Sequence, residues 1–125
     1  MKRFFLAALC LCFLQGCGKG AGDNADLNEA GPALRTALEA WKSGSPQKEL
    51  ANLNPPLLMN EDDWREGKRL MDYKMDEAGT LQGRQVVWRV QIKVQDKNGK
   101  TENVRAKYVV DTTPRIVIVR DRFAR

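Results

Sequence analysis

The sequence predicts an α+β fold in which N-terminal helices pack on a curved, four-stranded antiparallel sheet. Apolar residues recur at helical spacing in the first half of the domain, as at Leu34, Leu38 and Trp41. In the second half they alternate with polar residues, most clearly along residues 86–95. Helices followed by strands are typical of the α+β class, here in a single domain over residues 31–125.

Before this domain the chain carries Lys2 and Arg3, an uncharged apolar run over residues 4–14, and the sequence Leu14-Gln15-Gly16-Cys17. The run is too short to span a bilayer, which takes about 20 residues. The motif resembles the lipobox of bacterial lipoprotein signal peptides, as in small uncharacterised envelope lipoproteins. An ordinary secretory signal or a short membrane stem is the alternative.

The lipobox resemblance implies that residues 1–16 are removed and that Cys17 receives acyl chains, palmitate among them. The mature protein would then be anchored to a membrane of the cell envelope, facing the periplasm or the exterior. Residues 17–30 are mostly small or polar and are predicted to be a flexible tether. Cys10 and Cys12 would leave with the signal peptide, so no disulfide or free thiol remains.

The helices are predicted in sequence order from their caps. Gly31 is the expected N-cap of the first helix, with Pro32 as its first helical residue and Gly44 just after its end. Ser45-Pro46 starts a second, short helix, and residues 57–59 form a brief extended segment.

A third short helix is expected from Asn60, its N-cap, to about Gly67. The acidic cluster Glu61-Asp62-Asp63 falls in the first turn, where carboxylates accept from free backbone N–H groups and oppose the helix dipole. We therefore predict helix capping, in preference to a metal site, for this cluster.

Four strands follow. The first alternates Met71, Tyr73 and Met75 with polar residues, and the others cover residues 86–94, 104–110 and 115–122. A three-residue loop, Lys97-Asn98-Gly99 with Gly99 in the left-handed conformation, would join the middle pair. It would pair Trp88 with Tyr108, Val90 with Ala106 and Ile92 with Val104, which keeps the apolar residues on one face.

This order of elements resembles the NTF2-like superfamily, also called cystatin-like, over about residues 31–123. The resemblance implies a cone of helices and curved sheet and says little about function, because members include enzymes and binding modules. The enzymes commonly use an Asp and a His inside the cone, whereas this chain has no His. The catalytic implication therefore fails for this sequence.

The sequence offers no catalytic motif, metal set or cofactor motif, and we predict a non-enzymatic binding or structural module. One alternative is a carrier for a small apolar ligand in a cone lined by Met71, Met75, Trp88 and Tyr108. Another is a hydrolase or isomerase that uses a carboxylate of the cone. Its candidate residues are Asp72, Asp76 and Asp111. Trp41, Trp64 and Trp88 are each expected to be buried anchors.

Partners are predicted from charge. Without Lys2 and Arg3 the net charge is +3, which does not suggest a nucleic-acid binder. The polar face of the sheet would place like charges opposite each other, which is mildly destabilising. Its basic residues are Arg89, Lys93, Arg105 and Lys107. They form either a solvated face or a shallow site for an anionic envelope polymer or an acidic envelope protein. Residues 116–119 would add apolar contact at the sheet edge or in a homodimer.

Overall fold

The computed structural model of the protein describes residues 25–121. Its elements in chain order are α1 (Leu27–Lys42), the 3-10 helix η2 (Gln47–Asn52), β1 (Leu57–Asn60), α2 (Asp62–Arg65), β2 (Arg69–Met75), β3 (Thr80–Gln82), β4 (Gln85–Gln95), β5 (Thr101–Asp111) and β6 (Ile116–Arg120). The predicted signal peptide, Cys17 and residues 122–125 lie outside the described part of the chain.

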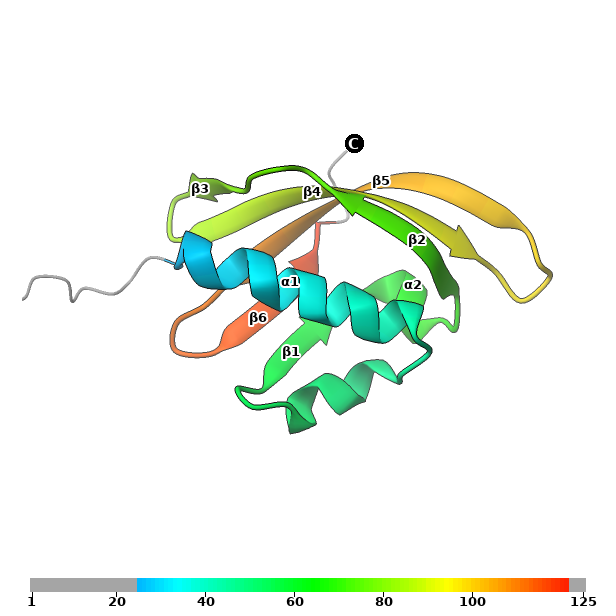
Figure 1. The fold of residues 1–125 in the computed structure, drawn as a ribbon, viewed down its shortest axis with the longest axis horizontal. Helices are drawn as coiled ribbons and strands as arrows, with labels where there is room; N and C mark the ends of the chain where they lie inside the picture. Colours follow the sequence, from blue (N-terminus) through cyan, green and yellow to red (C-terminus); the bar gives the residue numbers. More distant parts are fainter. Residues whose placement is uncertain (1–24, 122–125) are drawn as a thin grey trace, which may run out of the picture.

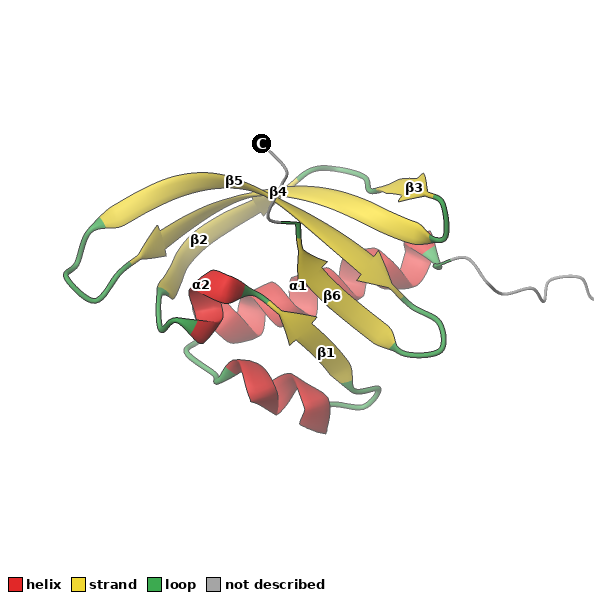
Figure 2. Ribbon diagram, turned by 180° about the vertical axis from the view of Figure 1, so that it is seen from behind, coloured by secondary structure: helices red, strands yellow, loops and turns green. Residues whose placement is uncertain are grey.

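The protein has an α+β fold, as the sequence predicts. The strands form one curved sheet in the order β1-β6-β5-β4-β2. The short strand β3 pairs with the first three residues of β4. The sheet curls into a half-barrel, and α1 lies along its concave side (Figures 1 and 2). The helices η2 and α2 lie close to β1 and close the lower part of the half-barrel.

The first helix begins earlier than predicted, inside the stretch 17–30 that the sequence assigns to the tether. Asp26 is the N-cap, and its side chain accepts a hydrogen bond from Asn28 N at 2.8 Å. Pro32 therefore lies inside the helix. The predicted end is confirmed, because Gly44 has a φ of +92° just after the C-cap and Ser45 N donates back to Ala40 O.

The sheet differs from the predicted four-stranded antiparallel one, because it is mixed and has six strands. The brief extended segment, β1, pairs in parallel with β6, Leu57 opposite Ile116 and Asn60 opposite Val119. β6 is consequently an internal strand, which corrects the expected edge position of residues 116–119.

The antiparallel register of the long hairpin is confirmed. Trp88 lies opposite Tyr108, and the polar-face pair Arg89 and Lys107 is also opposed. The turn is the predicted three-residue loop, with Gly99 at a φ of +86° and Asp96 N donating to Lys100 O. Turn geometry and alternation together were therefore sufficient to align these two strands.

The face of β2 is corrected by a β-bulge. Leu70 pairs with Val94 and Asp72 pairs with Lys93, so Met71 is the extra residue between them. The bulge turns Leu70 into the core and leaves Met71 37 % exposed. Met71 therefore does not share the inner face with Tyr73 and Met75, as simple alternation had predicted.

Trp88 is tightly packed in the core between α1 and the sheet. Its indole N–H donates to Asp76 O at 2.9 Å, and its ring lies against two glycines. A Cβ added at Gly79 would come within 2.3 Å of Trp88 Cε3, and one at Gly31 within 2.8 Å of Cη2. Trp88 is 8 % exposed, so the predicted anchoring position is confirmed for it.

We expect Trp88→Ala to lower the free energy of unfolding by about 3 to 5 kcal/mol, because it leaves a cavity in the core. Arg89→Ala, one residue along β4 on the exposed face, is the matched control and should change stability by less than about 0.5 kcal/mol. Urea denaturation measures both. Equal stability of the two variants would contradict this account of the core.

Candidate functional site

The predicted pocket-lining residues do not line the cleft of about 830 Å³ that lies at the end of α1. Trp88 and Tyr108 are buried in the core below α1, and Met75 is half-buried against that core. Met71 is exposed at the bulge of β2. The helix thus occupies the space that the apolar-ligand carrier would need to be open.

The predicted basic face exists as a surface on the outer side of β4 and β5. Arg89 stands opposite Lys107 and Gln91 opposite Arg105, and two shallow depressions of about 350 and 400 Å³ lie over these residues. Lys93 has Asp72 of β2 as its other neighbour. The carboxylate of Asp72 therefore borders this face, which is one of the two arrangements that the solvated-face interpretation allows.

The three candidate catalytic carboxylates are separated by the fold. Asp72 and Asp76 are exposed, and Asp72 lies 3.6 Å from Lys42 Nζ. Asp111 is half-buried at the end of β5, near Gln85. No two of these three carboxylates contact each other, and none faces the core of the half-barrel.

A buried polar cluster lies instead where α2 meets the sheet. Glu61 is completely buried, and its carboxylate accepts from Asp63 N at 2.9 Å, from Arg120 Nη1 at 3.0 Å and from the Tyr108 hydroxyl. Arg120 also reaches Asp63 Oδ2 at 2.7 Å, and Lys68 Nζ lies 3.1 Å from Asp63 Oδ1. Glu61, and not the expected Asn60, is the N-cap of α2.

The pKa values of the two carboxyl groups in this cluster, Glu61 and Asp63, are shifted in opposite directions. Burial raises the pKa of Glu61 above its usual range, against the hydrogen bond from Tyr108 and the charge of Arg120. Burial also acts on Asp63, but hydrogen bonds from Arg120 and Lys68 outweigh it and lower the Asp63 pKa. The Tyr108 hydroxyl, next to Glu61 and buried, has a raised pKa. Every member has a partner, so the cluster is a structural brace.

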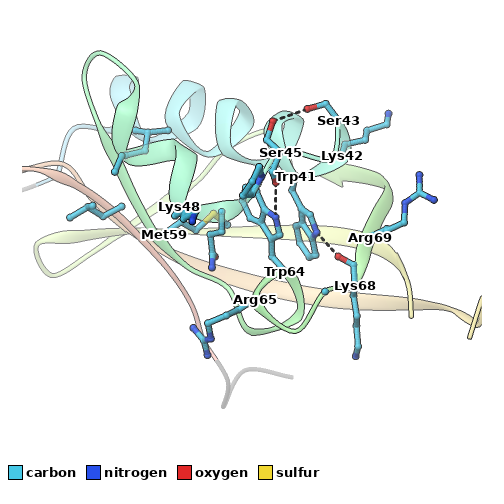
Figure 3. A pocket seen from close by; sticks show the side chains of 17 residues that line it. Trp41, Lys42, Ser43, Ser45, Lys48, Met59, Trp64, Arg65, Lys68 and Arg69 are labelled. Atoms are coloured by element: carbon cyan, nitrogen blue, oxygen red, sulfur yellow. Dashed lines mark hydrogen bonds between the residues drawn. The ribbon is translucent and has the colours of Figure 1, made fainter. Parts of the chain in front are cut away.

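The brace holds one wall of a cleft of about 830 Å³. The end of α1, η2, β1 and the segment from α2 to β2 surround it (Figure 3). Trp41 and Trp64 stack at its centre, with ring centroids 5.5 Å apart and planes within 9°. Their indole N–H groups donate to Lys68 O and Ser45 O, which fixes both rings.

The lining of this cleft is basic and apolar. Its residues include no Asp or Glu, and its cationic residues are Lys42, Lys48, Arg65, Lys68 and Arg69. Three of these make ion pairs, Lys42 with Asp72, Arg65 with Asp62 and Lys68 with Asp63. Within residues 25–121, Lys48 and Arg69 have no ion pair.

The sequence identified the two tryptophans as buried anchors, which is confirmed at 2 % exposure for Trp41 and 7 % for Trp64. It missed the cleft, because the cations come from four elements that only the tertiary fold brings together. The one available signal was the run Arg65 to Arg69, which carries three basic residues around Gly67.

Over residues 25–121, no group of three or more His, Cys, Asp or Glu side chains is placed to hold a metal ion. No helix in that range has the length and apolar character needed to cross a membrane.

We expect Glu61→Ala to lower the free energy of unfolding by about 3 to 5 kcal/mol, since it leaves the Tyr108 hydroxyl and part of the Arg120 guanidinium buried without a partner. Glu61→Gln keeps a hydrogen-bonding group of similar size and should cost less. Urea midpoints measure both. If alanine and glutamine cost the same, the cluster is not a brace.

The raised pKa of Glu61 sets the sign of its pH dependence. Between the unfolded-state pKa near 4.5 and the folded value, the folded protein binds more protons. Rising pH therefore reduces wild-type stability in that window. The advantage of wild type over Glu61→Gln should accordingly shrink as the pH rises above 4.5, and urea midpoints measured over a pH series check it.

Comparison of the chain with protein-family models, curated proteins and solved structures found no match.

Proposed function

We propose that this protein is a lipid-anchored, non-enzymatic binding module of the cell envelope whose ligand site is the Trp41–Trp64 cleft. We choose this cleft because its lining contains five cationic side chains and no carboxylate. A ligand with an apolar body and an anionic group fits such a lining.

The charge argument rests on uncompensated cations. Lys48 and Arg69 lie on different walls of the cleft (Figure 3) and have no carboxylate partner among the described residues. An anion between them would gain from both charges in a concave site, where low-dielectric walls strengthen the field. Because Lys42, Arg65 and Lys68 are already paired, they add less to this attraction.

The apolar argument rests on the walls between these charges. Leu57, Leu58 and Met59 of β1 form one side, and Pro46 and Ala51 belong to η2 and its start. Ser43 and Ser45 supply hydroxyls at the rim, 3.5 Å from each other. Small-molecule sites typically combine an apolar lining with a few polar groups that orient the ligand.

The anchor and the fold family are part of the same proposal. The Cys17 motif supports a lipid anchor and a place in the envelope. The single helix along a curved sheet and the strand order β2-β4-β5-β6 support an NTF2-like cone. In such a cone the usual interior pocket is here filled by Trp88, Tyr108 and α1. The ligand site would therefore have moved to the end of the helix.

A second binding surface is favoured by one observation, the opposed pair Arg89 and Lys107 on the outer face. An anionic envelope polymer or an acidic partner protein would relieve that repulsion. The neighbouring Asp72 offers a solvated alternative, so this surface ranks below the cleft.

For the cleft we expect naphthalene-2-sulfonate to bind and its neutral sulfonamide to bind more weakly. The double variant Lys48→Glu/Arg69→Glu should lose roughly tenfold in affinity or more, because it replaces attraction by repulsion. Isothermal titration calorimetry measures the affinities.

The matched control is Arg89→Glu/Arg105→Glu, which changes the net charge equally on the outer face. It should bind the sulfonate as wild type does at physiological salt. If this control loses affinity and the cleft variant does not, the ligand site is the outer face.

For the anchor we expect Cys17→Ser to abolish acylation, because the acyl chain needs the thiol and the new N-terminus at that residue. Incorporation of radiolabelled palmitate in cells measures it. Labelling that persists in the variant would contradict the lipoprotein assignment.

A further inference from the structure

The two residues that precede α1, Ala25 and Asp26, are hydrogen-bonded to one end of the domain. Ala25 N donates to Arg84 O at 2.8 Å, and Asp26 N donates to Thr112 Oγ1 at 2.7 Å. These contacts hold the chain against the turn between β3 and β4 and the loop between β5 and β6. The start of α1, β3 and the β5–β6 loop lie at the same end of the half-barrel (Figures 1 and 2). We call this the entry end, with Leu27, Leu81, Arg84 and Arg115 as its defining residues.

The entry end presents two large apolar side chains to solvent. Leu27 is 43 % exposed and Leu81 is 42 % exposed, more than any other large hydrophobic residue among those described. Leu27 opens α1, and Leu81 lies on the short strand β3 that pairs only with β4. Arg84 and Arg115 are also exposed, and they lie in the β3–β4 turn and the β5–β6 loop of the same end. Leucines with arginines next to them are typical of surfaces that lie in a membrane interface.

The length of the intervening chain limits how far this end can lie from the anchor. Cys17 and Ala25 are eight residues apart, which is at most about 29 Å of fully extended chain. The helix α1 alone, with 16 residues, is about 24 Å long. Acyl chains on Cys17 would therefore keep the entry end near the bilayer, while the other end of α1 can lie a helix length further away.

We propose that the entry end docks on the bilayer that holds the acylated Cys17, with Leu27 and Leu81 in the headgroup region and Arg84 and Arg115 at lipid phosphates. This proposal rests on the proposed acylation. Because the anchor already holds the domain close, docking is an intramolecular step with a high effective concentration, and a small apolar contact is sufficient.

The charges of the entry end show which lipids are needed. Arg84 and Arg115 are matched by the carboxylates Asp26 and Glu29 in the same region, and Asp26 is partly occupied in capping Asn28 N. With no net positive charge, the contact depends on the leucines and does not require anionic lipid. The basic outer face, in contrast, would need anionic lipid to dock.

Docking in this way orients the cleft. Trp41 lies in the last turn of α1, so the helix runs from the membrane contact to the proposed ligand site (Figure 1). The cleft therefore lies at the end of α1 that is further from the bilayer, where ligands of the aqueous phase can reach it.

The test uses the acylated full-length product in vesicles of neutral phosphatidylcholine with bromine on the acyl chains. The mature chain has Cys17 as its only cysteine, so a cysteine introduced at Leu27 or at Leu81 can be labelled with a bimane fluorophore. Bromine quenches only a fluorophore close to the lipid. Met71→Cys is the matched control, because Met71 is 37 % exposed but lies on β2 near the opposite end.

We expect quenching by roughly twofold or more at positions 27 and 81, with none at position 71, in neutral and in anionic vesicles alike. Absence of quenching at both leucine positions in a chain whose acylation is verified by mass spectrometry overturns the docking and leaves the anchor standing. A chain without acylation overturns both. Quenching of a label at Lys93 that appears only with anionic lipid overturns the proposal in favour of the basic face.

Discussion

The arrangement of α2, β5 and β6 depends on one constraint, the buried ion pair between Glu61 and Arg120. It joins the N-cap of α2 to the end of β6, and Tyr108 adds the adjacent strand β5 to the same point. A carboxylate that is completely buried is costly unless each of its oxygens has a donor. The requirement for donors therefore fixes three elements against one another more strictly than apolar packing would.

The cleft depends on that constraint. Trp64 follows Glu61 by three residues, and Lys68 is tied to Asp63 of the same cluster. With α2 held in this way, Trp64 can stack on Trp41 and the carbonyl of Lys68 can accept from the Trp41 indole. Residues 61–69 thus supply both the carboxylates of the brace, Glu61 and Asp63, and three cations of the cleft, Arg65, Lys68 and Arg69.

Local patterns predicted the parts of the fold that depend on local rules. Alternation and the Gly99 turn gave the pairing of β4 with β5, and Gly44 marked the end of the first helix.

Three features of the fold could not be predicted from local patterns. The parallel pairing of β1 with β6 joins segments far apart in the chain. The bulge at Met71 interrupts alternation without a glycine or proline to mark it. The partner of Glu61 lies 59 residues away, so its burial could not be read from the acidic cluster alone.

The position of β6 inside the sheet has a consequence for the order in which the domain can form during synthesis. β6 is the last of the strands within residues 25–121, yet it separates β1 from β5 and carries the cation for Glu61. Until Arg120 has left the ribosome, β1 has no strand to pair with and the buried carboxylate has no counter-charge. Contacts between such distant segments form late. A chain that stops before β6 would therefore leave β1 unpaired, and the domain can close only after Arg120 has been made.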